Sequence, residues 1–361
     1  MRVVMTLIFL PFLCLISLLS YAGETLTDKL SRPWGMAFVS DHQLLISERA
    51  GTLQLFDINS RQLLPVAGAP AVVFDGQGGL LDVAVPADFA THGWIYFTWS
   101  HQLNGGNAAT ALGRARLNLT QQPLRLSDWQ TLLITRSGST TRHHYGSRIA
   151  FDDSHVFFSV GDRGNRDNGQ DLQTHAGSIL RLNRDGSVPP DNPFSGRADA
   201  LAEIWSYGHR NPQGLVWDGQ HKRLWAIEHG PRGGDELNLI ESGANYGWAE
   251  VSWGKEYWNP MYVGDARTKP GMKDPLKMYD PSIAPSSLLL YRGDLLAGAL
   301  KLQHLNYIQL DNAEDVGVKG EKRLLSGLKE RLRALAVDSQ GRLYIASDSG
   351  KLYRYDQLPE N

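Results

Sequence analysis

The chain has 361 residues, of which 42% are hydrophobic and 20% charged, with 36 Lys and Arg against 38 Asp and Glu and a single cysteine. The formal net charge of −2 is too even for a general nucleic-acid binder or for a protein held to acidic membranes by charge. The length exceeds the usual size of a single hydrophobic core, but architectures that add repeated units grow without thickening a core.

The first 22 residues carry one positive charge, at Arg2, followed by a short apolar stretch and small residues before a break. These features describe a cleavable secretory signal better than a membrane span. The only cysteine, Cys14, lies inside the stretch, so the mature chain is expected to have no disulfide. We therefore predict a signal peptide at 1–22, a soluble periplasmic or otherwise exported product, and no stable membrane insertion after cleavage.

A pattern of two short apolar runs separated by a polar turn then recurs six times along the chain. The copies begin at Trp34, Gly79, Gly146, Gln213, Ser286 and Leu332, at spacings of roughly 45 to 75 residues. Two short strands per unit at such spacings are typical of a closed β-propeller, an all-β fold. Helix-like stretches are short, such as 198–204, and no linker divides the chain, so we predict one domain over 23–361.

Two segments, 162–193 and 230–281, are longer and richer in Gly, Asp and Asn than a propeller blade needs. Long ordered loops in compact domains commonly carry function, although a decorative surface loop has the same composition. We expect the functional loops to lie on one face of the propeller.

Polar residues just ahead of the first apolar runs would ring one mouth of the central channel. They are Gln77, His144, Arg148, Arg210, Asn211, Asp280, Arg331 and Arg333, and Lys301 follows the second run of the fifth copy. Guanidinium groups favour planar carboxylates or phosphates. The set therefore predicts an anion pocket with a base beside it.

His144 is the candidate general base, because imidazole titrates near neutral pH and can take a proton from a substrate hydroxyl. Asp162 ends the second strand of the same repeat, where its carboxylate can hold one ring nitrogen and fix the tautomer. The pair is expected to act as one unit, with His143 as a neighbour outside it.

The loop from Glu228 to Trp248 offers hard oxygen ligands for a metal. They are the carbonyls near Gly230 and Pro231, the carboxylates of Asp235 and Glu236, and the side chain of Asn238. Oxygen-rich, Gly-bent loops suit Ca²⁺, and no cysteine or close histidine pair suggests Zn²⁺. The spacing does not fit the regular EF-hand pattern.

Nine short motifs occur in order along nearly the whole predicted mature chain. They are "GQGGLLDVAV" at Gly76, "HYGSRIAFD" at His144, "GDRGNRDNGQ" at Gly161, "ILRLNRDGSVPPDNPF" at Ile179, "GHRNPQGL" at Gly208, "EHGPRGGDELNLI" at Glu228, "NYGW" at Asn245, "APSS" at Ala284 and "RLRALAVD" at Arg331. With these motifs the chain closely resembles the soluble sugar dehydrogenases that use pyrroloquinoline quinone (PQQ), specifically the aldose sugar dehydrogenase branch of the soluble glucose dehydrogenase family.

The resemblance implies a six-bladed β-propeller with PQQ over the channel mouth and a Ca²⁺ ion that bridges cofactor and protein. It implies that aldose sugars are oxidised at the anomeric carbon to lactones, with His144 as general base and Asp162 as its orienting carboxylate. Calcium makes the quinone a better hydride acceptor. Electrons then pass to an external acceptor whose identity the sequence does not give.

The resemblance also assigns further residues by position. Arg210 and Asn211 match the pair beside the quinone carbon that receives hydride, and Arg210 is counted as catalytic. The remaining cofactor contacts that it implies are Gln77, Tyr257, Lys301, Arg331 and Arg333. Carbonyls of Gly230 and Pro231 match the holders of the cofactor Ca²⁺, and Glu236 and Tyr246 match ligands of a separate structural Ca²⁺.

Two positions depart from the glucose dehydrogenase branch. Asp280 stands where that branch has a tryptophan, and His143 stands where it has an aspartate. The loss of an aromatic wall at the substrate mouth predicts a broader or weaker aldose specificity.

Two other classes of function stay open from the residues alone. A Ca²⁺-dependent lactone hydrolase on a propeller would rely on a carboxylate-lined metal at the channel axis. A non-catalytic binding propeller would have the scaffold without turnover, and would not need His144, Asp162, Arg210 and Asn211 together.

Overall fold

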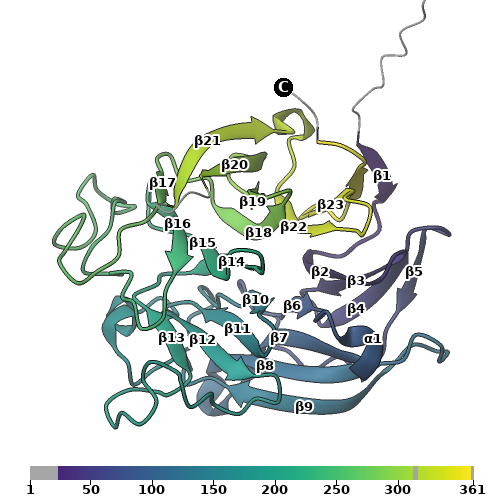
Figure 1. The fold of residues 1–361 in the computed structure, drawn as a ribbon, viewed down its shortest axis with the longest axis horizontal. Helices are drawn as coiled ribbons and strands as arrows, with labels where there is room; N and C mark the ends of the chain where they lie inside the picture. Colours follow the sequence, from purple (N-terminus) through teal and green to yellow (C-terminus); the bar gives the residue numbers. More distant parts are fainter. Residues whose placement is uncertain (1–22, 312–315, 359–361) are drawn as a thin grey trace, which may run out of the picture.

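A computed structural model describes residues 23–311 and 316–358. Its strands form six four-stranded antiparallel sheets arranged as a ring (Figure 1). The prediction of an all-β, six-bladed β-propeller is therefore confirmed. The predicted signal peptide at 1–22 lies outside the described residues, and no helix among the described residues is long and apolar enough to cross a membrane.

Five blades each use four consecutive strands, numbered from the channel outward. They are β2 (Pro33–Ser40), β3 (Gln43–Glu48), β4 (Thr52–Asp57) and β5 (Gln62–Pro65); β6 (Leu80–Ala84), β7 (Trp94–Gln102), β8 (Ala108–Leu117) and β9 (Leu126–Ile134); β10 (Ile149–Phe151), β11 (His155–Val160), β12 (Ser178–Asn183) and β13 (Ile204–Tyr207); β14 (Pro212–Asp218), β15 (Arg223–Glu228), β16 (Asp235–Ile240) and β17 (Lys277–Tyr279); and β18 (Pro285–Tyr291), β19 (Asp294–Ala299), β20 (Leu305–Asp311) and β21 (Gly317–Leu324).

The sixth blade joins both ends of the described chain. It contains β22 (Leu332–Val337), β23 (Leu343–Ser347), β24 (Leu352–Tyr355) and, as its outermost strand, β1 (Glu24–Thr27). Residue Glu24 lies opposite Arg354 in this pairing, and their side chains form an ion pair at 3.0 Å. The pairing closes the ring and covers an edge of β24 that would otherwise be open.

Helices are few in the described part of the chain. There is one α-helix, α1 (Phe89–His92), and three 3₁₀ turns, η1 (Asn104–Gly106), η2 (Arg166–Gln170) and η3 (Ser326–Leu328). The helix-like stretch expected at 198–204 is not helical, and its last residue begins β13. The two long segments are also not pure insertions, because the first contains β12 and the second contains β16 and β17.

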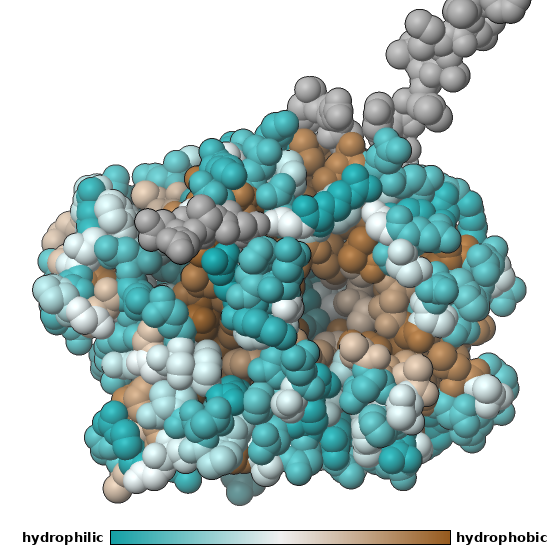
Figure 2. Space-filling model, in the orientation of Figure 1, coloured by the Kyte–Doolittle hydropathy of each residue, from teal (hydrophilic) through white to brown (hydrophobic). Residues whose placement is uncertain are grey.

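The hydrophobic core consists of layers between blades rather than of one centre. Each of the six gaps between neighbouring blades holds its own cluster of buried apolar side chains. In β3, Leu44 and Ile46 pack toward the sixth blade, whereas Leu45 packs toward the second. Because successive side chains of a strand face opposite sides, a strand between two blades needs apolar residues throughout. The face of the molecule seen in Figure 2 is mainly hydrophilic and has a hollow near the centre of the ring, with apolar side chains around it.

Arg148 lies on the channel axis, just ahead of β10, and is buried. Its guanidinium pairs with the Asp82 carboxylate of β6, with 2.9 Å between Nη1 and Oδ1. It also donates to backbone carbonyls of β2, β14, β18 and β22, namely those of Trp34, Gln213, Ser286 and Arg333. One side chain therefore contacts the innermost strands of all five other blades. The expectation that Arg148 belongs to the mouth is wrong, because its donors are taken up inside the channel.

Candidate active site

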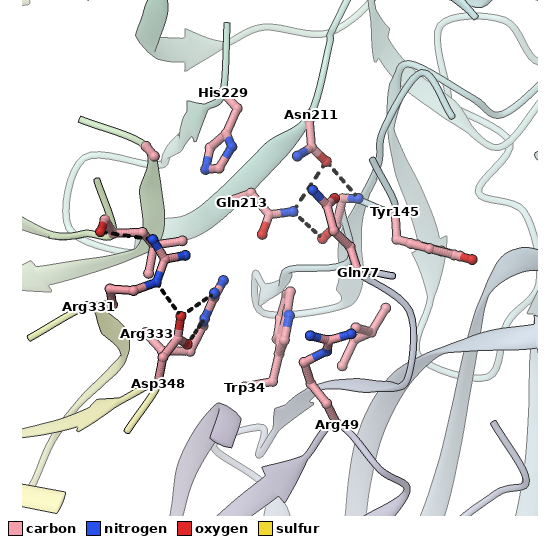
Figure 3. Close-up of a pocket in the computed structure, with 14 residues that line it drawn as sticks. Trp34, Arg49, Gln77, Tyr145, Asn211, Gln213, His229, Arg331, Arg333 and Asp348 are labelled. Carbon is pink, nitrogen blue, oxygen red and sulfur yellow. Dashed lines mark hydrogen bonds and ion pairs between the residues drawn. The ribbon is translucent and has the colours of Figure 1, made fainter. Parts of the chain in front are cut away.

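The candidate site lies at the mouth where innermost strands begin. Blade strands are antiparallel, so the residues ahead of each innermost strand meet those that follow the second strand. A cavity of about 270 Å³ opens there (Figure 3). Four predicted residues line it, Gln77, Asn211, Arg331 and Arg333, and the lining residues that were not predicted include the charged Arg49 and Asp348.

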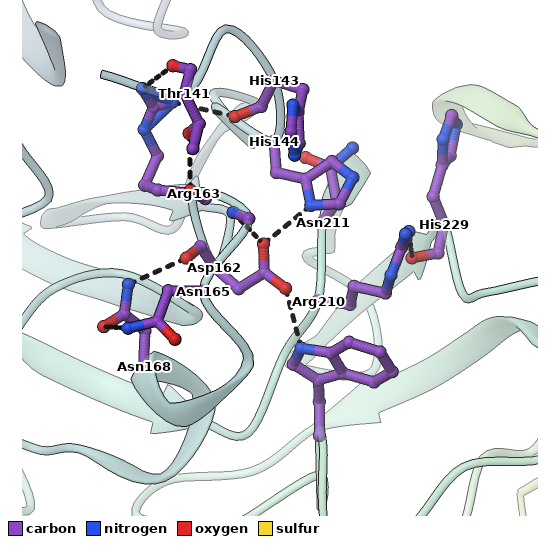
Figure 4. A network of polar contacts seen from close by, with 12 residues as sticks. Thr141, His143, His144, Asp162, Arg163, Asn165, Asn168, Arg210, Asn211 and His229 are labelled. Atoms are coloured by element: carbon purple, nitrogen blue, oxygen red, sulfur yellow. Dashed lines mark hydrogen bonds and ion pairs between the residues drawn. The ribbon is translucent and has the colours of Figure 1, made fainter. Parts of the chain in front are cut away.

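His144 and Asp162 form the expected pair beside this cavity (Figure 4). The distance from His144 Nδ1 to Asp162 Oδ1 is 2.7 Å, and the side chains are 13% and 2% exposed. A carboxylate can only accept, so Nδ1 carries the proton and Nε2 is the basic nitrogen. Asp162 is itself oriented by the Trp248 indole, whose Nε1 donates to Oδ2 at 2.8 Å, and by the Gly164 amide at 2.7 Å.

The backbone at His144 is held in the left-handed region, with φ of 57°. This conformation is costly for a residue other than glycine and persists where contacts fix it. The His144 amide donates to Gln77 Oε1 at 2.8 Å, and the second strand of the blade comes close at Gly161. A Cβ at Gly161 would lie 2.3 Å from the His144 carbonyl oxygen, so the approach requires glycine.

The environment of the pair keeps the imidazole neutral and the carboxylate charged. Burial lowers the pKa of His144, and the hydrogen bond that its Nδ1 donates to Asp162 only partly offsets this, while Arg210 lowers it further. Burial alone would raise the pKa of Asp162, but the hydrogen bonds from His144 and Gly164 hold it below its usual value. At neutral pH Nε2 is therefore free to accept a proton.

Arg210 and Asn211 are positioned through Glu228, the last residue of β15. One Glu228 oxygen accepts from the Arg210 amide at 2.7 Å and from the Asn211 amide at 3.3 Å. The other oxygen lies 2.9 Å from Nδ1 of the buried His209, whose Nε2 lies 2.9 Å from Ser206 Oγ. The Arg210 guanidinium stacks on the Trp248 ring at 5.3 Å, and it does not line the cavity.

The cavity wall carries more positive than negative charge. Arg331 and Arg333 share one carboxylate, that of Asp348, at 2.7 to 3.0 Å. Three guanidinium groups and one carboxylate line the cavity, which leaves two positive charges. Its imidazole, that of His229, is neutral because burial lowers the pKa of this group to about 3. The wall therefore fits an anionic ligand, and Trp34 and Tyr145 add flat apolar surfaces.

Two predicted cofactor contacts lie outside the cavity wall. Lys301 is exposed and directly follows Leu300, which does line the cavity. Tyr257 is 63% exposed on the long loop at 241–276. The structure thus places Lys301 at the rim of the cavity, and it places Tyr257 on a loop where its ring is exposed to solvent.

The predicted calcium positions lie in and below the turn at 230–235. The Gly230 carbonyl accepts from Arg210 Nη1 at 2.9 Å, and the Pro231 carbonyl accepts from Ser282 Oγ at 3.0 Å. The Gly230 oxygen keeps a second lone pair for a cation, whereas the Pro231 oxygen also accepts from the Gly234 amide at 3.2 Å, a contact that a bound cation would have to replace. The Asp235 oxygens each accept from one backbone amide, those of Gly230 and Ala284, so this carboxylate holds the turn in place and keeps one lone pair on each oxygen. Across residues 23–311 and 316–358, no three His, Cys, Asp or Glu side chains form a metal-binding group.

Glu236 and Tyr246, the predicted structural calcium ligands, flank Glu228 in the same blade. Burial raises the pKa of Glu236 well above its usual value, and the nearby Glu228 carboxylate adds to this effect. Asn238 donates through Nδ2 to both carboxylates, to Glu228 Oε1 at 3.3 Å and to Glu236 Oε2 at 3.5 Å, and its Oδ1 is buried without a hydrogen-bond partner. The Tyr246 hydroxyl is already used, because it donates to the Leu239 carbonyl at 2.5 Å and accepts from the Glu241 amide. Only its backbone oxygen is left for a metal.

Several site residues that the sequence did not predict follow the second strand of a blade, a position from which only the side chains of Asp162 and Lys301 were predicted. Arg49, His229 and Asp348 each follow the second strand of a blade, as Asp162 does. The antiparallel hairpin places both kinds of position at one mouth. A search for polar residues after each second strand would have found them, whereas the role of Trp248 depends on how the loop folds back.

A histidine–carboxylate pair beside a cation-rich cavity indicates a β-propeller enzyme in which a general base lies next to the binding site of an anionic ligand. Residues 30–354 match the family model described as Glucose / Sorbosone dehydrogenase, and the chain belongs to this family. It is 36% identical over 363 residues to the aldose sugar dehydrogenase YliI of Escherichia coli strain K12, covering 95% of this chain and 96% of that one.

Solved structures agree with this family. The crystal structure of the soluble aldose sugar dehydrogenase from Escherichia coli in the apo-form has a TM-score of 0.86 at 34% identity, and covers 92% of this chain and 98% of that chain. The PQQ-bound form of the aldose sugar dehydrogenase from Streptomyces coelicolor has a TM-score of 0.79 at 27% identity, with 92% and 96% covered. The resemblance inferred from the nine motifs is confirmed.

Proposed function

We propose that the protein oxidises aldose sugars at the anomeric carbon to lactones, with PQQ and Ca²⁺ as cofactors. The observation that supports this best is the His144–Asp162 pair beside a cavity with two surplus positive charges. PQQ carries three carboxylates, so it would use the charge that the cavity offers. Relatives that share the fold and the family act on the same class of substrate by their names.

His144 would accept the proton of the anomeric hydroxyl at Nε2, since Nδ1 is committed to Asp162. Asp162 then stabilises the imidazolium, and Trp248 keeps the carboxylate from rotating away. The Arg210 guanidinium, which lowers the pKa of His144, adds positive charge where negative charge develops. PQQ, when bound, supplies the quinone that accepts the hydride.

The residues that would hold PQQ are those of the cavity wall and rim. Gln77 and Asn211 offer amides, and Arg331 and Arg333 present guanidinium groups to carboxylates. We propose Lys301 and Tyr257 as rim contacts. Trp34 and Tyr145 would pack against the planar rings of the cofactor.

Carbonyls of Gly230 and Pro231 would hold the Ca²⁺ that polarises the cofactor, since hard cations prefer oxygen ligands. Glu236 and the Tyr246 backbone oxygen would hold a second, structural Ca²⁺. A cation there would stabilise the charged form of the Glu236 carboxylate, which burial disfavours, and would give Asn238 Oδ1 a partner.

The decisive experiment titrates the purified apo protein with PQQ in the presence of Ca²⁺ and follows the cofactor absorption. We expect stoichiometric binding at micromolar concentrations and PQQ-dependent reduction of a dye with a panel of aldoses. Chelation before reconstitution should prevent activity, and added Ca²⁺ should restore it. A protein that binds no quinone under these conditions would refute the proposal.

The alternatives from the sequence have less support. A propeller hydrolase would need a metal on the channel axis, but Arg148 occupies that axis and brings a positive charge. Lactone hydrolysis with Ca²⁺ and without PQQ would revive this alternative. A purely binding propeller would leave the oriented Asp162, His144 and Trp248 unexplained.

We also propose export through cleavage near residue 22, which N-terminal sequencing of the mature protein would test. Broad aldose specificity is proposed from Asp280, which is exposed, and from His143, whose ring packs edge-on against His144 at 4.5 Å. Comparable kcat/KM values for several aldoses would support this, and a strong preference for glucose would contradict it.

A further inference from the structure

Arg49 directly follows β3 and lines the same cavity as Arg331 and Arg333 (Figure 3). Its Nη2 donates to the carbonyls of Gly76 and Gly78, the latter at 2.9 Å. Its guanidinium also lies 5.4 Å from the centre of the Phe74 ring. These contacts fix the guanidinium in place at the cavity wall.

The donors of Arg49 are not fully used. Its Nε is buried and has no hydrogen-bond partner, and within 23–311 and 316–358 the side chain makes no ion pair. Arg331 and Arg333 differ in this respect, because both pair with Asp348. Orphaned buried donors are rare in folded proteins and call for a partner.

The electrostatic surroundings of Arg49 agree with a missing anion. Burial lowers its pKa and the like charges of Arg333 and Arg32 lower it further, and the Asp348 carboxylate offsets only part of this effect. Of the three guanidinium groups at the cavity, Arg49 is the one that forms no ion pair with a carboxylate. A ligand with at least two negative charges would balance the wall.

We infer that Arg49 is a further binding residue for a polycarboxylate ligand, and that the apo mouth binds small tricarboxylates in competition with PQQ. The first part rests on the proposed function, because it assigns Arg49 to a carboxylate of PQQ. The second part does not, because it follows from the charge of the wall alone. Citrate is the probe, since it offers three carboxylates and no quinone.

The test compares Arg49→Gln with Arg32→Gln in the purified apo protein. Arg32 is a matched control, because its guanidinium stacks on the same Phe74 ring at 5.7 Å but does not line the cavity. Citrate binding is measured by calorimetry, and PQQ binding by absorption titration with and without citrate. We expect Arg49→Gln to weaken both ligands about ten- to a hundredfold, the loss of a charged hydrogen bond, and Arg32→Gln to change neither.

Arg49 also supports residues 76–78, which carry Gln77, so a structural effect must be separated from a charge effect. Arg49→Lys keeps the charge but replaces the guanidinium, whose Nη2 donates to both carbonyls, by an ammonium group on a shorter, more flexible stem. It should retain citrate affinity within a few-fold. Equal loss of citrate affinity in Arg49→Lys and Arg49→Gln would overturn the charge role.

The outcomes also distinguish this inference from the proposed function. Arg49-dependent citrate binding without any PQQ binding would support the anion site and refute the PQQ enzyme. Wild-type affinity of Arg49→Gln for PQQ and citrate would overturn the inference and leave the proposed function intact.

Discussion

The arginine inside the channel and the three arginines at its mouth differ in how their hydrogen-bond donors are used. Arg148, inside the channel, donates hydrogen bonds from its guanidinium to the Asp82 carboxylate and to backbone carbonyls of four further blades. At the mouth, Arg331 and Arg333 share Asp348, and Arg49 forms no ion pair with a carboxylate in the part of the chain that the structure describes. Arg148, whose donor nitrogens all have partners, holds the blades together at the axis. At the mouth the guanidinium groups outnumber the carboxylates, so donors are left for a ligand.

The comparison predicts the largest effect for Arg148→Met. Burial raises the pKa of Asp82 even with Arg148 beside it, so the carboxylate would remain buried without its partner. Removing one member of a buried pair typically costs about 3–5 kcal/mol of unfolding free energy. Urea denaturation of the apo protein measures this. Asp82→Asn added to Arg148→Met should recover part of the loss, and a loss below about 1 kcal/mol would show that the axial contacts are dispensable.

At the mouth, His144→Ala should change turnover rather than stability. Loss of a general base reduces the rate on the order of 10²- to 10⁴-fold, while PQQ affinity and the urea midpoint stay near wild type. His143→Ala is the matched control, because His143 makes no hydrogen bond to Asp162 and should cost only a few-fold. Dye reduction by the reconstituted variants gives both values. Turnover of His144→Ala within a few-fold of wild type would exclude His144 as the base.

Arg333→Gln tests the contrast between the channel and the mouth, because it removes one positive charge from a cavity wall where guanidinium groups outnumber carboxylates. The remaining partner of Asp348 is Arg331, so no carboxylate is left unpaired. We expect PQQ to bind about ten- to a hundredfold more weakly and the urea midpoint to stay the same or rise. Absorption titration and denaturation of one preparation test both. A loss of unfolding free energy as large as in Arg148→Met would show that the mouth arginines stabilise the fold as the channel arginine does.

Much of the fold and part of the site could be predicted from the sequence. Apolar runs such as Leu44 to Ile46 face two blades at once, so the repeat was visible without a structure. His144 and Asp162 were predictable because each sits at a fixed place in the repeat. Arg148 was misplaced because the position before a strand does not say whether a long side chain turns into the channel or toward the mouth. The Trp248 contact was also out of reach, since it joins Asp162 to a residue far along the chain.

The smallest expected effect is in the pH dependence, and it tests whether the mouth acts as a unit. Burial and Arg210 lower the pKa of His144 below the ordinary value of an imidazole, so the base form persists to lower pH than in a free histidine. The acid limb of kcat/KM should therefore have its midpoint below about 6.5, the ordinary pKa of histidine. Asp162 raises the pKa of His144, so Asp162→Asn should move the acid limb to still lower pH and reduce the plateau. A limb that moves to higher pH in Asp162→Asn would mean that this carboxylate does not act on His144, even though the two groups lie 2.7 Å apart.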